Sequence, residues 1–237
     1  MRFRVISRIV WALLSAFAVE SLVFGLAVLP ALTFWEWHFR WPVQPPWVRT
    51  VLLSMAFIPA YIIFAVVLMV LSAATSRLFG WRTPVDAELR LDEARKPLLD
   101  WARYGISTQL VRIFAGPLFR STPVWAYYMR LNGARLGSRV YVNSLRVADH
   151  NLLDFDDDVV IGGDVHLSGH TVERGVLKTA RVRLGRGVTV GVGSVVSIGV
   201  EAGDGCQIGA LSFVPKFSKL EANSIYVGTP VRKLEDR

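Results

Sequence analysis

The chain has very little cysteine and contains long stretches without charge. Cys206 is the single cysteine among 237 residues, so no disulfide can form within the chain. Residues 9–35 contain no lysine or arginine, and residues 50–76 contain no charged residue at all. Together with a mean hydropathy of +0.39, these absences exclude a disulfide-stabilised secreted domain and an ordinary soluble protein.

Both stretches are long enough to cross a membrane as helices. Each has 27 residues, which at about 1.5 Å per residue gives roughly 40 Å of helix, more than a ~30 Å hydrocarbon core requires. Tryptophans stand near the expected helix ends, as in an aromatic belt: Trp35, Trp37, Trp41, Trp47 and Trp81. We therefore predict two α-helical transmembrane segments within residues 1–82. A cleaved signal peptide is disfavoured, because the first apolar run is too long and no small-residue cleavage site precedes Trp35.

Two crossings place both ends of the chain on the same side of the membrane. Arg2, Arg4 and Arg8 precede the first helix, and Arg77 and Arg82 follow the second. Basic residues favour the cytoplasmic side, so we expect an inner-membrane protein with both termini in the cytoplasm. The formal net charge of +8 then indicates contact with anionic membrane lipid. We expect no nucleic-acid partner, because no basic cluster is flanked by aromatic residues.

The last hundred residues carry an aliphatic side chain at every sixth position. The main series is Leu184, Val190, Val196, Ala202, Ile208 and Val214. A second series stands two positions earlier and is smaller on average: Val182, Val188, Ser194, Val200, Cys206 and Ser212. A six-residue period is the repeat of a parallel β-helix, in which three hexads close one coil. Residues two apart on a strand point the same way, so both series, with Cys206 as a core thiol, should face the interior.

The repeat begins near Ala134 and is broken over 149–155 and 170–180, which indicates loops extruded from a corner. The pattern predicts a transmembrane hairpin (1–82), a linker with juxtamembrane interfacial helices (83–130) and a β-helix domain (131–237). Residues 105–130 mix apolar, aromatic and arginine side chains without acids, which favours helices lying in the membrane interface. Helices that cover the end of the β-helix are the alternative. Four to five coils bury too small a core alone, so several copies are expected to associate.

The C-terminal motifs resemble those of the hexapeptide-repeat acyltransferases. The hexads, Val-Pro-Lys at 214–216 and Ser-Ile-Tyr-Val-Gly-Thr-Pro-Val-Arg-Lys at 224–233 carry the resemblance, with Thr229 where that family usually has asparagine. The resemblance implies a left-handed parallel β-helix, a homotrimer, and acetyl-coenzyme A or another acyl-coenzyme A as donor.

A narrower resemblance reaches further upstream. Arg-Leu-Asn-Gly-Ala-Arg-Leu-Gly at 130–137, Asn-Leu-Leu at 151–153, and His170 ahead of Glu173 resemble the membrane-bound C-terminal domain of non-ribosomal peptide synthetases such as ε-poly-lysine synthetase. In that family transmembrane helices alternate with degenerate β-helix domains, whereas here one β-helix follows two crossings.

The acyltransferase resemblance implies a histidine that removes the acceptor's proton as the acceptor attacks the thioester. His170 stands where the repeat breaks and is the first candidate for this base. His150 stands in the earlier break and is the second. Asp149, which stands beside His150 and could orient its imidazole, and Glu173 are the candidate orienting carboxylates. A structural role is the alternative for each histidine.

The remaining histidines are not expected at the site. His38 lies in the segment between the helices, and His166 adjoins the inward Leu167 and should point outward. A zinc site of three histidines is therefore disfavoured, and no metal is expected. The coenzyme should approach the C-terminal coils, as it does in the relatives. Its candidate binding residues are Lys216, Arg232, Lys233, Gly209 and Ala210, for whose charged members ordinary surface charge is the alternative.

These observations predict a membrane-tethered acyltransferase that transfers an acetyl or acyl group to a hydroxyl or amine. A membrane-associated acceptor is expected, such as a lipid-linked saccharide, a surface polymer or a peptide, because tethering raises its local concentration. The alternative is a non-catalytic trimeric scaffold in a peptide- or polysaccharide-synthesis or export complex. Four arginines are expected either to hold an acidic acceptor or to anchor the chain to lipid: Arg112, Arg120, Arg130 and Arg135. Glu20, inside the first helix, is expected as a protonated group at a helix contact, with a functional role as the alternative.

Overall fold

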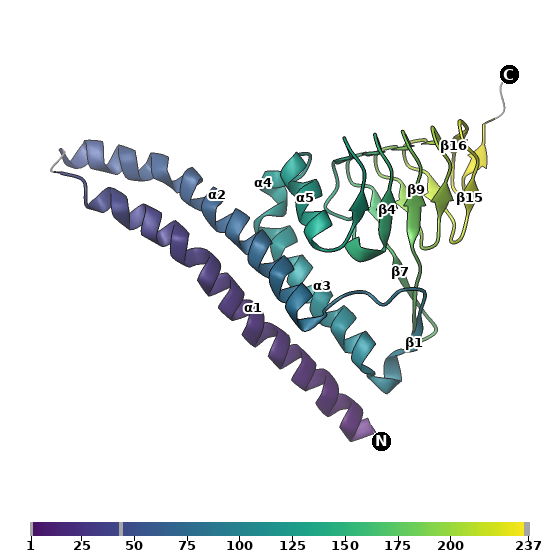
Figure 1. Cartoon of the computed structure of the whole chain (residues 1–237), viewed down its shortest axis with the longest axis horizontal. Coiled ribbons are helices and arrows are strands. Elements are labelled where there is room, and N and C mark those ends of the chain that lie inside the picture. Colours follow the sequence, from purple (N-terminus) through teal and green to yellow (C-terminus); the bar gives the residue numbers. More distant parts are fainter. Residues whose placement is uncertain (1, 43–44, 235–237) are drawn as a thin grey trace.

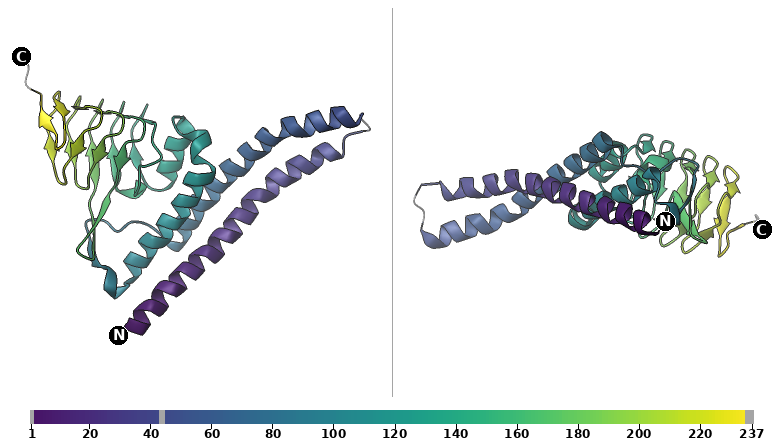
Figure 2. Two further views of the ribbon diagram at one scale, coloured as in Figure 1. Left: turned by 180° about the vertical axis from the view of Figure 1, so that it is seen from behind. Right: turned by 90° about the horizontal axis from the view of Figure 1, so that it is seen from below.

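A computed structural model describes residues 2–42 and 45–234; Val43 and Gln44 of the Pro-rich connection and residues 235–237 lie outside the described residues. Helices α1 (Arg2–Phe39) and α2 (Pro46–Phe79) form a long antiparallel hairpin that projects away from the rest of the molecule (Figures 1 and 2). Both helices are long and apolar enough to cross a membrane, and only 28% of the most apolar window of each is buried. A core helix of a soluble protein would be mostly buried.

The ends of α2 follow from its sequence. Pro46 opens the helix, where its missing N–H costs nothing. Gly80 closes it in the left-handed conformation (φ 68°), and the N–H groups of Gly80 and Trp81 donate to the carbonyls of Arg77 and Ser76. The ring of Trp81 is buried and stacks on Phe79. The aromatic-belt position predicted for Trp81 is therefore wrong, because this ring packs inside the molecule.

A layer of short elements joins the hairpin to the strands. It consists of β1 (Glu88–Arg90), the 3₁₀ turn η1 (Leu91–Glu93), α3 (Lys96–Phe114), α4 (Gly116–Phe119) and α5 (Pro123–Leu131). Helix α3 runs alongside the hairpin, and α4 and α5 lie between α2 and the first strands (Figure 1). Trp125 and Met129 of α5 are buried, and the N–H of Ser121 donates to the carbonyl of Val142 at 3.1 Å. The helices of 105–130 thus cover the end of the β-helix, as the alternative interpretation has it.

Three parallel sheets form the walls of the strand region. One contains β2 (Arg135–Leu136), β4 (Leu153–Phe155), β9 (Val182–Leu184), β12 (Glu201–Ala202) and β15 (Lys219–Leu220). A second contains β3 (Tyr141–Val142), β5 (Val160–Ile161), β10 (Thr189–Val190), β13 (Gln207–Ile208) and β16 (Ile225–Val227), with β17 (Arg232–Lys233) antiparallel at its edge. The third contains β6 (His166–Leu167), β11 (Val195–Val196) and β14 (Phe213–Val214).

The strand pairing follows the hexad period. Thr189 pairs with Gln207, and Glu201 pairs with Lys219, so each strand lies beside the one that begins three hexads later. Every member of the two hexad series is buried, including Cys206. The predicted parallel β-helix with an interior built from both series is therefore confirmed.

The two breaks in the repeat have different structures. The first is a 3₁₀ turn, η2 (His150–Leu152), at a corner of the coil. The second is an extruded antiparallel hairpin, β7 (His170–Glu173) with β8 (Val176–Thr179). Strand β1 pairs along the outer edge of β8, with Glu88 opposite Lys178. Part of the segment predicted as a linker therefore belongs to a sheet. The same segment places Thr83 and α3 beside the first coils of the β-helix.

Candidate functional site

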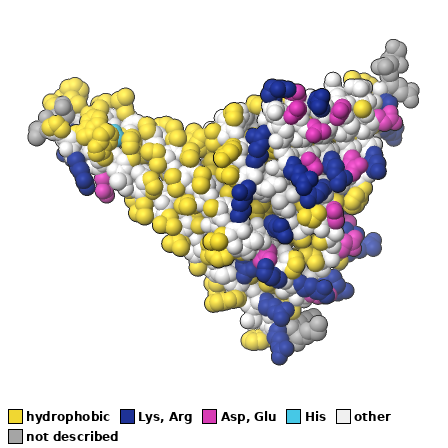
Figure 3. Space-filling model, in the orientation of Figure 1, with side chains coloured by type: hydrophobic (Ala, Val, Ile, Leu, Met, Phe, Trp, Pro, Cys, Tyr) yellow, Lys and Arg dark blue, Asp and Glu magenta, His cyan; other side chains and the backbone are white. Residues whose placement is uncertain are grey.

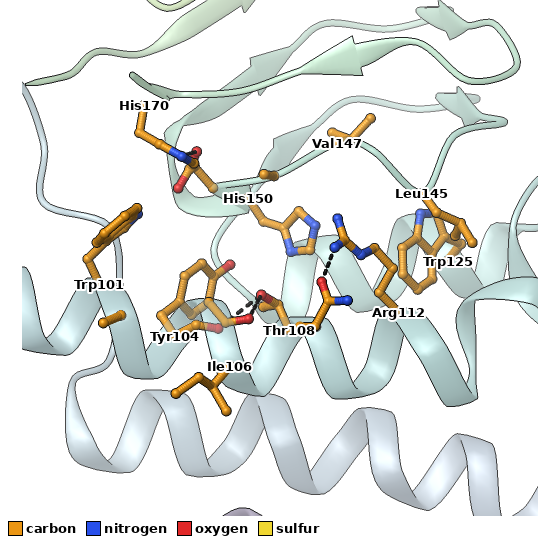
Figure 4. A pocket seen from close by; sticks show the side chains of 15 residues that line it. Trp101, Tyr104, Ile106, Thr108, Arg112, Trp125, Leu145, Val147, His150 and His170 are labelled. Atoms are coloured by element: carbon orange, nitrogen blue, oxygen red, sulfur yellow. Dashed lines mark hydrogen bonds and ion pairs between the residues drawn. The ribbon is translucent and has the colours of Figure 1, made fainter. Parts of the chain in front are cut away.

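A cavity of about 470 Å³ opens where α3 and α5 meet the first coils, and we call it the His170 pocket. The side chains on its wall include Trp101, Tyr104, Arg112, Trp125, Asp149, His150 and His170 (Figure 4). Both breaks in the repeat contribute to it, His150 from η2 and His170 from the start of β7. The three leading candidate residues from the sequence thus lie around one cavity.

The central contact of the pocket joins Asp149 to His170. The Nδ1 atom of His170 lies 2.5 Å from Oδ2 of Asp149. Asp149 adopts the left-handed conformation (φ 55°), which aspartate tolerates better than most residues. This turn of the backbone directs the carboxylate to His170, whereas the sequence suggested that Asp149 orients its neighbour His150.

The Asp149 carboxylate is buried and fully partnered. Oδ1 accepts a hydrogen bond from the Thr83 hydroxyl at 2.7 Å, and Oδ2 accepts from the Ser168 hydroxyl at 3.0 Å and from the N–H of Gly169 at 3.1 Å. Burial opposes ionisation, but the hydrogen bond and charge of His170, with those from Thr83 and Ser168, outweigh it, so the pKa of Asp149 is lowered. The carboxylate is therefore a fixed negative charge behind the imidazole.

The imidazole ring of His170 is fixed by its contact with Asp149 and is still partly accessible to solvent. The side chain is 30% exposed, and the ring edge of Trp101 packs against it with centroids 5.1 Å apart. Burial disfavours the charged imidazole, yet the hydrogen bond and negative charge of Asp149 raise the pKa of His170 above its ordinary value. With Nδ1–H donating to Asp149, Nε2 carries the lone pair, the arrangement that a general base requires.

His150 has a different environment in the same pocket. Its ring is buried between Tyr104 and Tyr128, at centroid distances of 6.4 and 5.7 Å, and its Nδ1 has no hydrogen-bond partner among the described residues. Burial is the main cause that lowers the pKa of His150 to about 4. The ring is neutral at pH 7 and has no orienting carboxylate, so it suits a wall of the pocket better than a base.

The other candidate residues lie outside the pocket. Glu173, at the far end of β7, forms an ion pair with Lys216 and not with His170. His166 is exposed while Leu167 is buried, as the hexad register predicted. His38 lies at the far end of α1, with Nδ1 2.9 Å from the Phe34 carbonyl. Within residues 2–42 and 45–234, no three His, Cys, Asp or Glu side chains are grouped to hold a metal ion.

The predicted coenzyme-binding residues lie in the last coils. Lys216 follows β14, in the sheet that also contains β6 beside His170, so one face of the β-helix leads from Lys216 toward the pocket. Arg232 and Lys233 are exposed on β17, where Lys233 pairs with Glu221 at 2.5 Å. At Gly209 a Cβ atom would meet Val227 at 2.8 Å. Ala210 is exposed in the corner after β13. None of these residues lines the His170 pocket, and their coenzyme role stays a prediction.

Some residues in and around the pocket gave no signal in the sequence. Thr83 stands in a charged, proline-bounded segment that was predicted as a linker, and Tyr104 sits on a helix with no distinctive motif. Arg112, expected either to hold an acidic acceptor or to anchor the chain to lipid, lies on the wall of the pocket. Ser168 is a small polar residue two positions before His170, at the break of the repeat. This position close to His170 is the local feature that could have indicated that Ser168 donates to Asp149.

Comparison with known proteins finds distant relatives. No protein-family profile matches the chain. Over 134 residues the chain is 25% identical to the delta-poly-L-ornithine synthetase of Acinetobacter baumannii (strain AB307-0294), a stretch that covers 55% of this chain and 10% of that protein. The chain therefore spans about a tenth of the length of the curated relative that it matches.

Solved structures with a similar fold include several acetyltransferases. A hexapeptide-repeat acetyltransferase of Vibrio cholerae is 19% identical with a TM-score of 0.39, covering 44% of this chain and 62% of that one. A galactoside acetyltransferase in complex with coenzyme A is 23% identical with a TM-score of 0.40, covering 48% and 70%. The serine acetyltransferase of Brucella abortus strain S19 is 17% identical with a TM-score of 0.40, covering 93% and 71%.

Both resemblances predicted from the sequence are thus found, as distant similarities that concern the fold. The predicted fold class is confirmed by the strand pairing of the chain itself: two long apolar helices precede a parallel β-helix of hexad repeats.

Proposed function

We propose that the chain is a membrane-tethered acyltransferase that moves an acetyl or other acyl group from acyl-coenzyme A to a hydroxyl or amine of a membrane-associated acceptor. The observation that carries the proposal is the His170–Asp149 pair at the edge of a cavity of about 470 Å³. A buried, fully hydrogen-bonded carboxylate behind a partly exposed imidazole has the geometry of a general base.

The proposed reaction uses His170 as base and then as acid. Nε2 takes the proton from the acceptor's hydroxyl or amine while the acceptor's oxygen or nitrogen attacks the thioester carbonyl. The C–S bond then breaks, and the imidazolium returns the proton to the leaving thiolate. Asp149 holds Nδ1–H and stabilises the imidazolium. Arg112, on the same wall, supplies positive charge near the carbonyl oxygen that becomes negative in the transition state.

The donor is proposed to lie along the sheet of β6, β11 and β14. This face leads from His170 to Lys216, and Arg232 and Lys233 supply further positive charge beyond it for the coenzyme phosphates. Two acetyltransferase structures of similar fold are complexes with acetyl-coenzyme A and with coenzyme A. A homotrimer, with the coenzyme at the boundary between copies, is part of the proposal.

The acceptor is proposed to be held at the membrane, in the inner membrane of the cell. Residues of α3 and α5 line the His170 pocket. Helix α3 also packs against both helices of the apolar hairpin (Figure 1), so the pocket adjoins the helices proposed to span the membrane. The distant relative is named as a synthetase of an amino-acid polymer, which makes an amine or peptide acceptor, or a role as partner of such a synthetase, part of the same proposal.

The test is thiol release from acetyl-coenzyme A by the purified full chain in detergent, in the presence of membrane lipid extract. We expect His170→Ala to lower the rate by about 100-fold or more, since a positioned general base contributes that much. Coenzyme binding, measured by calorimetry, should be unchanged. His166→Ala is the matched control, because His166 lies on the adjoining strand but is exposed and outside the pocket.

Two results would contradict the proposal. The first is an equal rate for wild type and His170→Ala. The second is absence of coenzyme binding at millimolar ligand, which would favour a non-catalytic scaffold in a synthesis or export complex.

A further inference from the structure

A second cavity, of about 340 Å³, shares the Tyr104 side chain as a wall with the His170 pocket. Arg77, Arg82, Arg135 and Arg181 line it, and none of its lining residues is acidic. We call it the basic pocket. The end of α2, the turn after α5 and the first coils of the β-helix all contribute to it, so the cavity forms only when these three parts are packed together.

Most of the positive charge in the basic pocket is not neutralised by the protein. Among the described residues, no carboxylate pairs with Arg77, Arg82 or Arg181, while Arg135 lies 3.7 Å from Asp154. Like charges lining one cavity repel one another, and an anion between them removes that cost. The charge of the cavity therefore favours an anionic ligand.

A buried hydroxyl group without a partner belongs to the same lining. Ser76 is 4% exposed, and its hydroxyl has no hydrogen-bond partner among the described residues. A buried polar group without a partner is costly, so it calls for an explanation. An oxyanion in the basic pocket would offer an acceptor to this hydroxyl as well as to the guanidinium groups.

The helix ends at the cavity do not by themselves explain the arginines. Gly80 and Trp81 donate to the carbonyls of Arg77 and Ser76 at the end of α2, and Arg77 donates to the Arg130 carbonyl at the end of α5 at 3.3 Å. The partial negative charge at a helix C-terminus amounts to about half an elementary charge, so the two ends together offset about one of the four arginines. Arg181 reaches the cavity from the residue before β9 in the β-helix.

An apolar groove of about 450 Å³ adjoins the basic pocket, and Arg77 lines both. Its other lining residues are Val70, Ala73, Ala74, Leu78 and Leu131. From Arg77 back to Val70 the groove follows two turns of α2, about 10 Å, into the uncharged stretch 50–76. On the molecular surface, lysine and arginine side chains gather where the apolar helices meet the β-helix (Figure 3). A ligand that fills both cavities must carry an anionic head and a hydrocarbon chain.

We propose that the basic pocket binds the phosphate of a membrane lipid whose hydrocarbon chain lies in the apolar groove. Guanidinium groups bind phosphate through paired N–H donors, and they do so best at a membrane surface where the lipid is already concentrated. Resting on the proposed function, this lipid is the acceptor: its phosphate is held on one side of Tyr104, and the group to be acylated extends toward the His170 pocket on the other.

The binding test uses the full chain in detergent, titrated with dioctanoyl phosphatidic acid, with dioctanoylglycerol, and with inorganic phosphate. Trp81 lines the basic pocket and is buried, so its fluorescence reports occupancy, and Trp81→Phe identifies its share of the signal. We expect the phosphate-bearing lipid to bind at least about tenfold more tightly than dioctanoylglycerol, because only it uses the arginines.

Paired variants locate the site. The double variant Arg82→Gln/Arg181→Gln should weaken phosphatidic acid binding by about tenfold or more. Arg183→Gln/Arg186→Gln removes the same charge from exposed positions on the β-helix and should leave binding unchanged. Arg82→Lys/Arg181→Lys keeps the charge but loses the paired donors, so its phosphatidic acid affinity should lie between the affinities of the other two double variants. Unchanged acetyl-coenzyme A binding in all three shows that they are folded.

The outcomes separate the lipid site from the proposed function. Equal binding of the two lipids, or equal weakening in the first two double variants, overturns the site. Displacement of phosphatidic acid by stoichiometric inorganic phosphate assigns a free-phosphate site and overturns the lipid part. Lipid binding without thiol release by wild type sustains the site while the acyltransferase fails. Thiol release without lipid binding sustains the acyltransferase while the site fails. His170→Ala should leave lipid binding intact.

Discussion

At the scale of single residues, the character of the site depends on how the backbone turns at Asp149. The left-handed conformation at this position points the carboxylate across the corner to His170, and Thr83, Ser168 and the N–H of Gly169 hold it there. A Cβ atom at position 169 would meet Leu152 at 2.8 Å, so only glycine leaves the backbone room to approach this closely. The position of the His170 imidazole relative to its carboxylate is thus determined by the local geometry at both breaks of the repeat.

The raised pKa of His170 predicts how activity depends on pH. The base must be neutral, so thiol release should increase as pH rises through the pKa of His170, which lies above the ordinary 6.5. Asp149→Asn removes the negative charge that raises this pKa. The midpoint of the pH profile should therefore move to lower pH, and the plateau should fall on the order of tenfold or more because the imidazole is no longer held and stabilised.

Asp164→Asn is the matched control for this pH profile. Asp164 is also an aspartate with positive φ (53°), but it is exposed and lies outside the pocket. Its midpoint should stay where the wild-type midpoint is. A profile for Asp149→Asn that keeps the wild-type midpoint would show that Asp149 does not act on the base through its charge.

The sequence predicted the residues of this pair but not the pairing itself. His170 and Asp149 were candidates because both stand at breaks of the hexad repeat. Which histidine Asp149 contacts depends on the backbone conformation at the corner and on Thr83, 66 positions away along the chain. No local pattern records a contact of that separation, so the sequence favoured the adjacent His150.

At the scale of elements, the β-helix could be predicted almost strand by strand, since a six-residue period with two inward positions fixes which side chains are buried. The structure of the two breaks could not be predicted, because a 3₁₀ turn and a hairpin interrupt a repeat in the same way. For a related reason, the sequence could not separate the two interpretations of the helices within 105–130. Their apolar faces satisfy both a membrane interface and a protein contact; the structure shows the contact with the first coil, and the interfacial position stays a prediction.

The coils depend on glycine where neighbouring corners stack. A Cβ atom at Gly191 would lie 2.4 Å from the backbone nitrogen of Ala210 and 2.7 Å from the carbonyl carbon of Gly209, in the next coil. Backbone atoms cannot move aside as the end of a flexible side chain can. Gly191→Ala should therefore lower the free energy of unfolding by about 1–3 kcal/mol, measured by chemical denaturation of the detergent-solubilised chain.

Gly163→Ala is the control for this effect, since its nearest atom would be Val192 Cγ2 at an ordinary 3.6 Å and its φ is not positive. It should change stability by a few tenths of a kcal/mol at most. Equal destabilisation by both variants would mean that the cost arises from glycine's flexibility and not from the contact between coils.

At the scale of the whole molecule, the basic pocket adjoins both the apolar hairpin, through Arg77 of α2, and the His170 pocket, through Tyr104. Glu20 is a carboxylic acid inside the apolar hairpin. It is buried in α1, its carboxyl oxygens have no hydrogen-bond partner among the described residues, and nearby a hydrogen bond of 2.8 Å joins Ser72 of α2 to Ser107 of α3. A buried helix contact is the position that the sequence suggested for it.

The proposed topology makes a prediction about the two ends of the molecule. If α1 and α2 cross the inner membrane with both termini in the cytoplasm, Trp47 at the start of α2 faces outward and Lys219 on β15 faces the cytoplasm. Both are exposed, with Trp47 at 70% and the Lys219 side chain at 83%. A cysteine introduced at either position is therefore accessible to a thiol reagent on its own side of the membrane.

The native cysteine should not react in this experiment, because Cys206 is fully buried and burial raises the pKa of its thiol to about 11. In spheroplasts, a membrane-impermeant maleimide should label Trp47→Cys at once and Lys219→Cys only after permeabilisation, and the wild type should stay unlabelled. The reverse pattern would place the β-helix on the outer side, away from the acyl-coenzyme A of the cytoplasm, and the donor in the proposed reaction would then have to be abandoned. Labelling of both positions only after permeabilisation would mean that the hairpin lies on the inner surface without crossing, where its exposed apolar side chains would rest on the lipid and the basic pocket would still face the head groups.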